Sequence, residues 1–345
     1  MTLHAHVLTD IDAAVFTRHA PGWQPEWDGV RFSFGLTLPA QMDVLIVYTR
    51  AGWTVRPGLP RGRTAFVAGE PEDIHPYSTA FLNQFGLVAA SLTRPLKTTL
   101  LHETPALPWF AGHHFFDPEK SVGFSELASW PVPEKDDKIS IVTSRKAGTP
   151  FQRQRLKLIE HLKDAIPDQI VLYGSEFNQI PDKKDAMLPH RYHLALENSG
   201  APFSWTEKLA DPLLCWAFPF YVGCSTVEEE LPGEAILRID PTDPEGAVQT
   251  MLAAIDNGLW EKRQAAIAQA RDRVLHYFNI LALFARIAKQ LAATPANGKP
   301  VTIRSEKSLP PEPGCRGSWP EMLARQAILA VDPEFELRIA RRRGR

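Results

Sequence analysis

Two short polar motifs in the middle of the chain have residue types that suit the binding of an anion. Glu197–Ser199 ends an alternating apolar stretch, and Thr206–Lys208 follows a few residues later. Lys208 falls in the first turn of an expected helix, where a cation is mildly unfavourable because the helix dipole is positive at that end. A bound anion, held by Lys208 and the backbone N–H groups of the helix start, would reverse this penalty. A solvated surface lysine is the alternative.

The residues around these motifs predict a strand, a loop, a helix and a second strand. Tyr192–Glu197 alternates apolar and polar residues, and Phe218–Val222 is apolar throughout. Between them, leucines fall on one helical face, and Ser204 with Glu207 is expected to form a capping box at the helix start. Ligands of an open parallel sheet bind beyond the carboxyl ends of its strands, so the motifs occupy the expected position of a ligand site.

The stretch ENSGAPFSWTEKLADPLLCWAFPFYVG resembles the donor-binding signature of the family 10 glycosyltransferases, the alpha-1,3/1,4-fucosyltransferases. E-N-S, T-E-K and the strand from Pro219 to Gly223 occur in the order and at the spacing of that family. The chain departs from the pattern at Ser204 and Trp205, where the family has Y-V. The missing tyrosine normally helps to hold the donor, and Phe203 and Trp205 are the candidates to replace it.

The resemblance implies an α/β, GT-B-like fold with two Rossmann-like domains facing a cleft. It also implies an inverting, metal-independent transfer of fucose from GDP-fucose to a hydroxyl of a glycan acceptor. No cofactor is expected, and GDP-fucose is the donor substrate. The donor-binding residues it assigns are Arg155, Glu197, Asn198, Ser204, Glu207 and Lys208. A transferase for another nucleotide sugar and a catalytically silent sugar-nucleotide or glycan-binding protein remain alternatives.

The family has an arginine at the start of a helix as a partner of the donor. In SRKAGTPFQRQRLKLIEHL, the alignment selects Arg155, and Arg145 and Arg153 compete for the role. An arginine fork suits a diphosphate because it can bond two oxygens at once. The family's YGxxF also recurs, as residues 173–177.

The resemblance places the catalytic base at Glu70, which directly follows the expected strand Arg63–Ala68. Glu72, Asp73 and His75 are close enough in sequence to be the true base. Without the resemblance, a solvated acidic turn is the simpler interpretation of this segment.

Length and charge narrow the class of protein. The 345 residues predict two domains, and 38 basic against 40 acidic residues give no sign of a nucleic-acid partner. Three unclustered cysteines indicate reduced thiols, and neither a signal peptide nor a membrane span is expected. We therefore expect a cytoplasmic protein like the soluble bacterial members of the family. The basic end ARRRGR is expected to be a disordered tail or to touch the inner face of an anionic membrane.

Changes in pattern predict three regions: an N-terminal acceptor-side α/β domain at 1–132, a donor-binding Rossmann-like domain at 139–291 and a Pro-rich arm at 292–345. Pro131–Lys138 is expected to link the two domains. The first domain shows strands at 42–48, 63–68 and 86–91. The second shows strands at 139–143, 169–173, 192–197, 218–222 and 235–239, and helices at 151–166, 244–254 and 260–291. In the arm, Ser318–Leu329 is expected to be helical.

Overall fold

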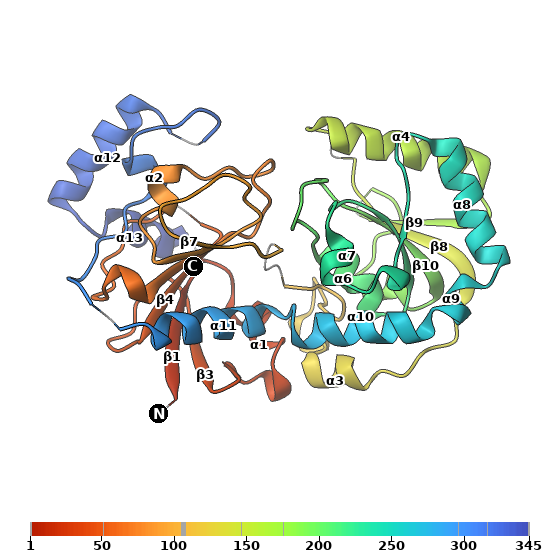
Figure 1. The fold of residues 1–345 in the computed structure, drawn as a ribbon, viewed down its shortest axis with the longest axis horizontal. Coiled ribbons are helices and arrows are strands. Elements are labelled where there is room, and N and C mark those ends of the chain that lie inside the picture. The colour runs from red at the N-terminus through yellow and green to blue at the C-terminus, as the bar shows by residue number, and fades with distance from the viewer. Residues whose placement is uncertain are drawn as a thin grey trace. The chain divides into compact units, whose positions relative to one another are not determined.

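The structure is a computed structural model that describes residues 2–50, 52–104, 108–145, 147–174, 176–295, 297–315 and 317–343. The chain divides into two compact units (Figure 1). Unit 1 combines Met1–Leu107 with Ile280–Arg345, and unit 2 is Pro108–Asn279. These boundaries correct the expected ones: the supposed linker Pro131–Lys138 lies inside unit 2, and the chain returns to unit 1 at Ile280.

Unit 1 is built on a seven-stranded sheet. The strand order is β2 (Glu26–Trp27), β3 (Val30–Phe34), β1 (Leu3–Leu8), β4 (Val44–Tyr48), β5 (Thr64–Val67), β6 (Leu87–Ala89) and β7 (Thr99–Leu101). Every neighbouring pair is parallel except β2–β3. The predicted strands at 42–48, 63–68 and 86–91 are confirmed as β4, β5 and β6, whereas β1, β2, β3 and β7 were missed. Without the edge strand β2, the order by chain position is 2-1-3-4-5-6, a doubly wound sheet that reverses direction between β1 and β4.

Strand β4 shows why the sheet is buried on both faces. All five of its residues are buried. Val44, Ile46 and Tyr48 belong to the core that contains α11 (Ile280–Ala293), and Leu45 and Val47 to the core that contains α2 (Thr79–Leu82). Since side chains alternate along a strand, a continuous apolar run needs cover on both sides.

Helix α11 explains where the chain returns to unit 1. The sequence predicted one helix over Trp260–Leu291, but the structure has α9 (Leu259–Lys262), α10 (Gln264–His276) and α11. The second of these ends at His276 with Tyr277 as its C-cap, and the side-chain amide of Asn279 donates to the carbonyl of Leu275 at 3.0 Å. Beyond that break, α11 contacts β1, β3 and β4 (Figure 1), and Phe284 packs edge-on to Tyr48 with ring centroids 5.6 Å apart.

The C-terminal arm also packs on unit 1. It contains the 3-10 turn Glu306–Ser308, α12 (Trp319–Val331), which confirms the predicted helix, and α13 (Phe335–Arg343). Ile303 and Leu337 are buried in the core around α2, and Arg341 donates to the carbonyl of Leu36 at 2.9 Å. The expected disordered tail is therefore wrong up to Arg343, because apolar residues of the arm complete that core; Gly344 and Arg345 lie outside the described residues. Contact of these basic residues with a membrane stays a prediction.

Unit 2 has a five-stranded, fully parallel sheet. The strand order is β12 (Leu237–Arg238), β11 (Phe218–Val222), β10 (His190–Leu196), β8 (Asp136–Val142) and β9 (Ile170–Tyr173). All five strands were predicted, although the one at 235–239 is shorter than expected. Read from β9 to β12 and numbered by position in the chain, the strand order is 2-1-3-4-5. The direction in which strands are added reverses between β8 and β10.

Helices complete unit 2. α4 (Pro150–Ala165) and α8 (Pro244–Asp256) lie side by side, while α6 (Glu207–Leu214) contacts β10 and β11, and α10 packs against α6 (Figure 1). The shorter helices of the chain are α1 (Ala13–Thr17), α3 (Phe124–Ser129), α5 (Lys184–Met187) and α7 (Val227–Glu230), with 3-10 turns at Pro21–Trp23, Arg61–Arg63, Pro118–Lys120 and Gly233–Ala235. Cys215, Cys224 and Cys315 are free thiols. Among the described residues, no helix is long and apolar enough to cross a membrane.

Two matched substitutions test which core α11 belongs to. Ile287 in α11 and Ile267 in α10 are both fully buried, the first in the unit 1 core and the second in the unit 2 core. Each Ile→Ala change should lower the free energy of unfolding by about 2–5 kcal/mol. In hydrogen exchange, Ile287→Ala should speed exchange in β4 and spare β10, and Ile267→Ala should do the reverse. Faster exchange of β10 in Ile287→Ala would contradict the division of the chain at Ile280.

Candidate functional site

Arg155 marks the point at which the unit 2 sheet reverses direction. It projects from α4 and donates from Nη1 to Asn198 Oδ1 at 3.0 Å and from Nη2 to the carbonyl of Ser144 at 3.4 Å. Ser144 follows the carboxyl end of β8 and Asn198 follows that of β10, so the guanidinium bridges the two strand ends. The crevice at such a reversal is where open α/β sheets bind ligands.

The guanidinium of Arg155 is buried without being fully satisfied. The residue is 5% exposed, and its Nε has no hydrogen-bond partner among the described residues. Burial lowers the pKa of Arg155, an effect that the nearby carboxyl of Glu197 opposes. Such a group is suited to an anion that can bond more than one of its N–H groups.

The two competing arginines lie elsewhere. Arg153 is exposed and donates to the carbonyls of Ala147 and Gly148, at 3.0 and 3.4 Å. Arg145 pairs with Glu176 at 3.6 Å, and its side chain is 71% exposed. Of the three arginines that the sequence left open, Arg155 is the one whose guanidinium joins the segments after β8 and β10, and Arg145 instead pairs with a residue that follows β9.

Glu197 fixes the start of α6. Its Oε1 accepts from the backbone N–H of Thr206 and its Oε2 from the Thr206 hydroxyl, both at 2.7 Å. Thr206 is the N-cap and accepts from the N–H of Lys208 at 3.3 Å. The expected capping box of Ser204 and Glu207 is therefore wrong, because the helix begins two residues later, with Thr206 as its N-cap. The N-cap N–H donates to the carboxylate of Glu197, which follows β10, and not to Glu207.

The hydroxyl of Ser204 forms its hydrogen bond within its own loop. Ser204 is fully buried, and its hydroxyl donates to the carbonyl of Ala201. Trp205 is also buried; its ring packs on Phe278 with centroids 4.9 Å apart, and its Nε1 donates to Glu230 at 2.7 Å. Phe203 is half-buried and holds a left-handed backbone with φ of 54°. Of the two aromatic residues near the missing tyrosine, Phe203 is therefore the one with exposed surface.

Two lysines share the carboxylate of Glu207. Lys208 Nζ lies 3.1 Å from Glu207 Oε1 and 4.0 Å from Glu197 Oε2. Lys183 Nζ lies 3.3 Å from the same Glu207 oxygen and 3.4 Å from Asp211 Oδ2. Lys208 thus has carboxylate partners within the protein, which also account for a cation in the first helical turn. Sequence reasoning missed Lys183, because it precedes α5 and only the tertiary fold brings it to α6.

The pKa values of the two glutamates of the site shift in opposite directions. Burial raises the pKa of Glu197 to about 7, although Lys208 opposes the shift. Burial acts in the same direction on Glu207, but the ammonium groups of Lys208 and Lys183 outweigh it and hold the pKa of Glu207 well below its usual range. Near neutral pH, Glu207 is therefore ionised, whereas Glu197 is present in both its protonated and its ionised form. Among the described residues, no group of three or more His, Cys, Asp or Glu could hold a metal ion.

Glu70 belongs to unit 1, whereas the residues described above belong to unit 2. Glu70 lies three residues beyond the end of β5, is half-buried, and stands close enough to Tyr77 to help raise the pKa of that phenol, for which burial is the main cause. Of its competitors, Glu72 pairs with Arg94, Asp73 is exposed, and His75 packs on Tyr77 with ring centroids 4.6 Å apart. The structure leaves the choice of Glu70 as a prediction.

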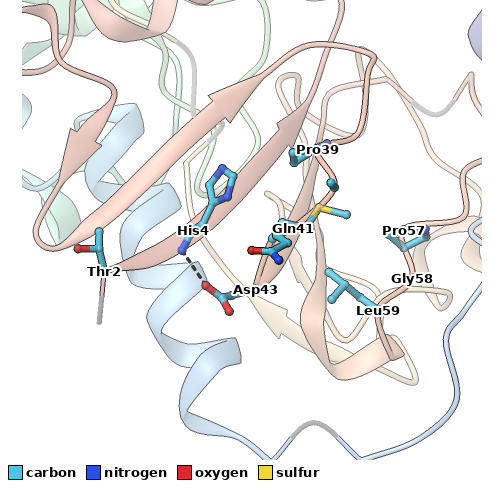
Figure 2. A pocket seen from close by; sticks show the side chains of 10 residues that line it. Thr2, His4, Pro39, Gln41, Asp43, Pro57, Gly58 and Leu59 are labelled. Carbon is cyan, nitrogen blue, oxygen red and sulfur yellow. Dashed lines mark hydrogen bonds between the residues drawn. The ribbon is translucent and has the colours of Figure 1, made fainter.

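A cavity of about 580 Å³ opens at the other edge of the unit 1 sheet (Figure 2). Its lining includes His4 near the start of β1 and Asp43 just before β4, and the His4 N–H donates to Asp43 Oδ2 at 2.9 Å. Because β1, β4 and β5 are parallel, Glu70 after β5 belongs to the opposite edge. None of the site residues predicted from the sequence lines this cavity, so it has no part in the predicted donor or base site.

Comparison with known proteins identifies the fold. No family model and no curated relative matches the sequence. A crystal structure of an alpha1,3-fucosyltransferase matches with a TM-score of 0.51 and 13% identity, over 85% of this chain and 91% of that one. A crystal structure of an alpha1,3-fucosyltransferase with GDP-fucose matches with a TM-score of 0.50 and 12% identity, over the same shares of the two chains. At this identity the likeness shows the fold alone: an α/β protein with two Rossmann-like domains of the GT-B type, as the resemblance implied.

Gly223 tests how tightly the Glu197 carboxylate is held. A Cβ at this position would lie 2.5 Å from Glu197 Cγ and 2.5 Å from the Tyr221 hydroxyl oxygen. Gly223→Ala should lower the free energy of unfolding by about 1–3 kcal/mol, because both neighbours are buried and must move. Gly233→Ala is the control, since its Cβ would meet Glu228 Cγ at an ordinary 3.5 Å. Equal unfolding temperatures for the two variants would contradict this packing.

The pKa of Glu197 predicts a dependence of stability on pH. The folded state keeps the Glu197 proton up to about pH 7, whereas the unfolded chain loses it near the ordinary value of 4.5. The folded state therefore binds more protons between these values, and stability falls as pH rises through them. Relative to Glu197→Gln, the wild-type protein should lose on the order of 1–3 kcal/mol between about pH 5 and pH 8 in chemical unfolding.

Glu234→Gln serves as the control for this pH dependence, because the Glu234 side chain is 72% exposed. Its unfolding curve should follow that of the wild type at each pH. Parallel curves for the wild type and Glu197→Gln would show that Glu197 does not hold its proton in the folded state.

Proposed function

We propose that this chain is a glycosyltransferase that moves fucose from GDP-fucose to a hydroxyl of a glycan acceptor, with inversion and without a divalent metal. The observation that carries the proposal is the position of Arg155, buried between the carboxyl ends of β8 and β10 and hydrogen-bonded to Asn198. The E-N-S and T-E-K motifs that resemble the family signature lie beside it. The GT-B fold shared with the fucosyltransferase structures supports the same interpretation.

The proposed donor site would bind the diphosphate through Arg155, Lys208 and the backbone at the start of α6. Negative charge grows on the leaving diphosphate as the bond to the sugar breaks, and fixed cations and N–H groups stabilise it. Glu207, held ionised by its two lysines, would accept hydrogen bonds from sugar or ribose hydroxyls, and Asn198 would line the same pocket. Glu197 would act by holding Thr206 and the helix start in place.

Glu70 would be the general base. It would take the proton of the acceptor hydroxyl while that oxygen attacks the anomeric carbon from the face opposite the diphosphate, which inverts the configuration. Its position shortly after a strand supports the role, because a rigid element can hold a base in the required geometry.

A transferase for another nucleotide sugar is the main alternative, favoured by the missing tyrosine of the signature. Trp205 is buried and packs on Phe278, whereas Phe203 is half-buried and would present its exposed surface to a sugar or base. A catalytically silent binding protein is the second alternative, and a test of turnover separates it from both transferases.

Donor binding is the first test. In a thermal-shift screen of GDP-fucose, GDP-mannose, UDP-sugars and bare nucleotides, GDP-fucose at about 100 times its Kd should stabilise the protein by roughly 2.7 kcal/mol. Arg155→Ala should weaken this binding by about 2–5 kcal/mol, because a desolvated phosphate partner is lost.

Arg153→Ala is the matched control on the same helix and should bind the donor within about 1 kcal/mol of the wild type, since its side chain is exposed. Stabilisation by UDP- or CMP-sugars alone would exclude a GDP-sugar donor. Transfer that EDTA abolishes and manganese restores would contradict the metal-independent mechanism.

Glu70→Gln is the test of the base. Glutamine keeps the shape of the side chain but cannot take a proton, so the transfer rate should fall by roughly 10² to 10⁴ while donor affinity stays nearly unchanged. Glu72→Gln, Asp73→Asn and His75→Gln are the matched comparisons. Normal turnover in Glu70→Gln with a large loss in one of the others would move the role to that residue, and normal turnover in all four would favour a non-catalytic protein.

A further inference from the structure

The segment between β5 and α2 contains Glu70, the proposed base. The residues that hold this segment in place can matter for catalysis only if the proposed function is right, so the inference below rests on that function. This segment, Glu70–Ser78, contains turns but no helix or strand. Arg94 binds its middle, pairing with the Glu72 carboxylate and donating to the carbonyl of Tyr77. The Tyr77 hydroxyl donates to the carbonyl of Thr49 at 2.7 Å, which ties the segment to the end of β4.

Carboxylates from the C-terminal arm bind the end of the same segment. Glu306 Oε1 accepts from the N–H of Ser78. The two carboxylate oxygens of Glu312 accept from the N–H groups of Thr79 and Ala80, at 2.9 and 3.0 Å. These N–H groups belong to the start of α2, where a helix has no internal acceptors and an anion is favourable.

The arm is itself fixed to unit 1 on both sides of these glutamates. Ile303 and Val55 exchange backbone hydrogen bonds of 2.9 and 2.8 Å. Glu336, which is 4% exposed, accepts from the Thr54 N–H and the Ser305 hydroxyl, both at 2.7 Å, and pairs with Arg325 at 3.2 Å. These contacts pack the arm against unit 1 on both sides of Glu306 and Glu312.

We propose that the arm, residues 303–343, is a strap that holds the base-bearing segment, and that Glu306 and Glu312 are positioning residues for Glu70. Glu306 is 5% exposed, and its buried carboxylate is directed at the backbone of the segment. Burying a carboxylate is costly unless it is hydrogen-bonded, so this contact is favourable only while the segment keeps its shape. A segment without secondary structure needs such external support to hold a general base in a productive geometry.

Glu312→Gln tests the strap, because Glu312 is only half-buried and the variant should fold. The amide nitrogen of glutamine cannot accept from an N–H group, so one of the two bonds to the start of α2 is lost. We expect hydrogen exchange over residues 70–82 to speed up by about tenfold or more. With GDP-fucose and a glycan acceptor, kcat should fall by about 5- to 50-fold at an unchanged donor KM, since small displacements of a catalytic group lower the rate strongly.

The control is Glu334→Gln in the same arm, whose side chain is 70% exposed and pairs with Arg341 instead of the segment. It should leave both exchange and kcat unchanged. Unchanged exchange over 70–82 in Glu312→Gln would overturn the strap, and faster exchange with a normal kcat would overturn the positioning role. If no nucleotide sugar supports transfer in the wild type, the proposed function fails, and the exchange measurement alone decides whether the arm holds the segment.

Discussion

The candidate site depends on the two hydrogen bonds that the Glu197 carboxylate accepts from Thr206. They join the end of β10 to the start of α6, and so fix the first turn that carries Glu207 and Lys208. When Glu197 is ionised, hydrogen bonds of this kind contribute about 1.5–3 kcal/mol each. Burial disfavours the ionised carboxylate and raises the pKa of Glu197 to about 7. The result is a rigid helix start whose support is sensitive to pH.

Around this junction, three cationic side chains, Lys183, Lys208 and Arg155, lie near the carboxyl ends of the unit 2 strands. Lys183 and Lys208 share Glu207, which is ionised and partly neutralises them. Arg155 is different, since its guanidinium bonds an amide and a carbonyl oxygen, not a carboxylate. Arg155 is thus a buried positive group whose charge an external anion could balance, and it stands where the sheet reverses direction.

Unit 1 is completed by the far end of the chain. Helix α11 covers one face of its sheet, and Ile303 and Leu337 of the arm enter the core on the other. Residues after 280 consequently support strands that begin at residue 3. This explains why division of the sequence into consecutive domains was wrong at both boundaries: a change in composition along the chain does not reveal which core an apolar helix joins.

The sequence by itself determined the five strands of the unit 2 sheet, the strands β4, β5 and β6 of the unit 1 sheet, the helices α4, α8 and α12, and the positions of the two polar motifs, because periodicity and loop residues are local properties. The resemblance limited the candidates for the donor-binding arginine to three and selected Glu197 and Asn198 as further donor-site residues. Only the tertiary structure placed the Arg155 guanidinium beside Asn198 and brought Lys183 to Glu207. It also showed that Thr206, supported by Glu197, is the N-cap of α6, where the sequence predicted a capping box of Ser204 and Glu207. Each of these depends on contacts between residues far apart in sequence, which the packing of helices on the parallel sheet creates and no local pattern encodes.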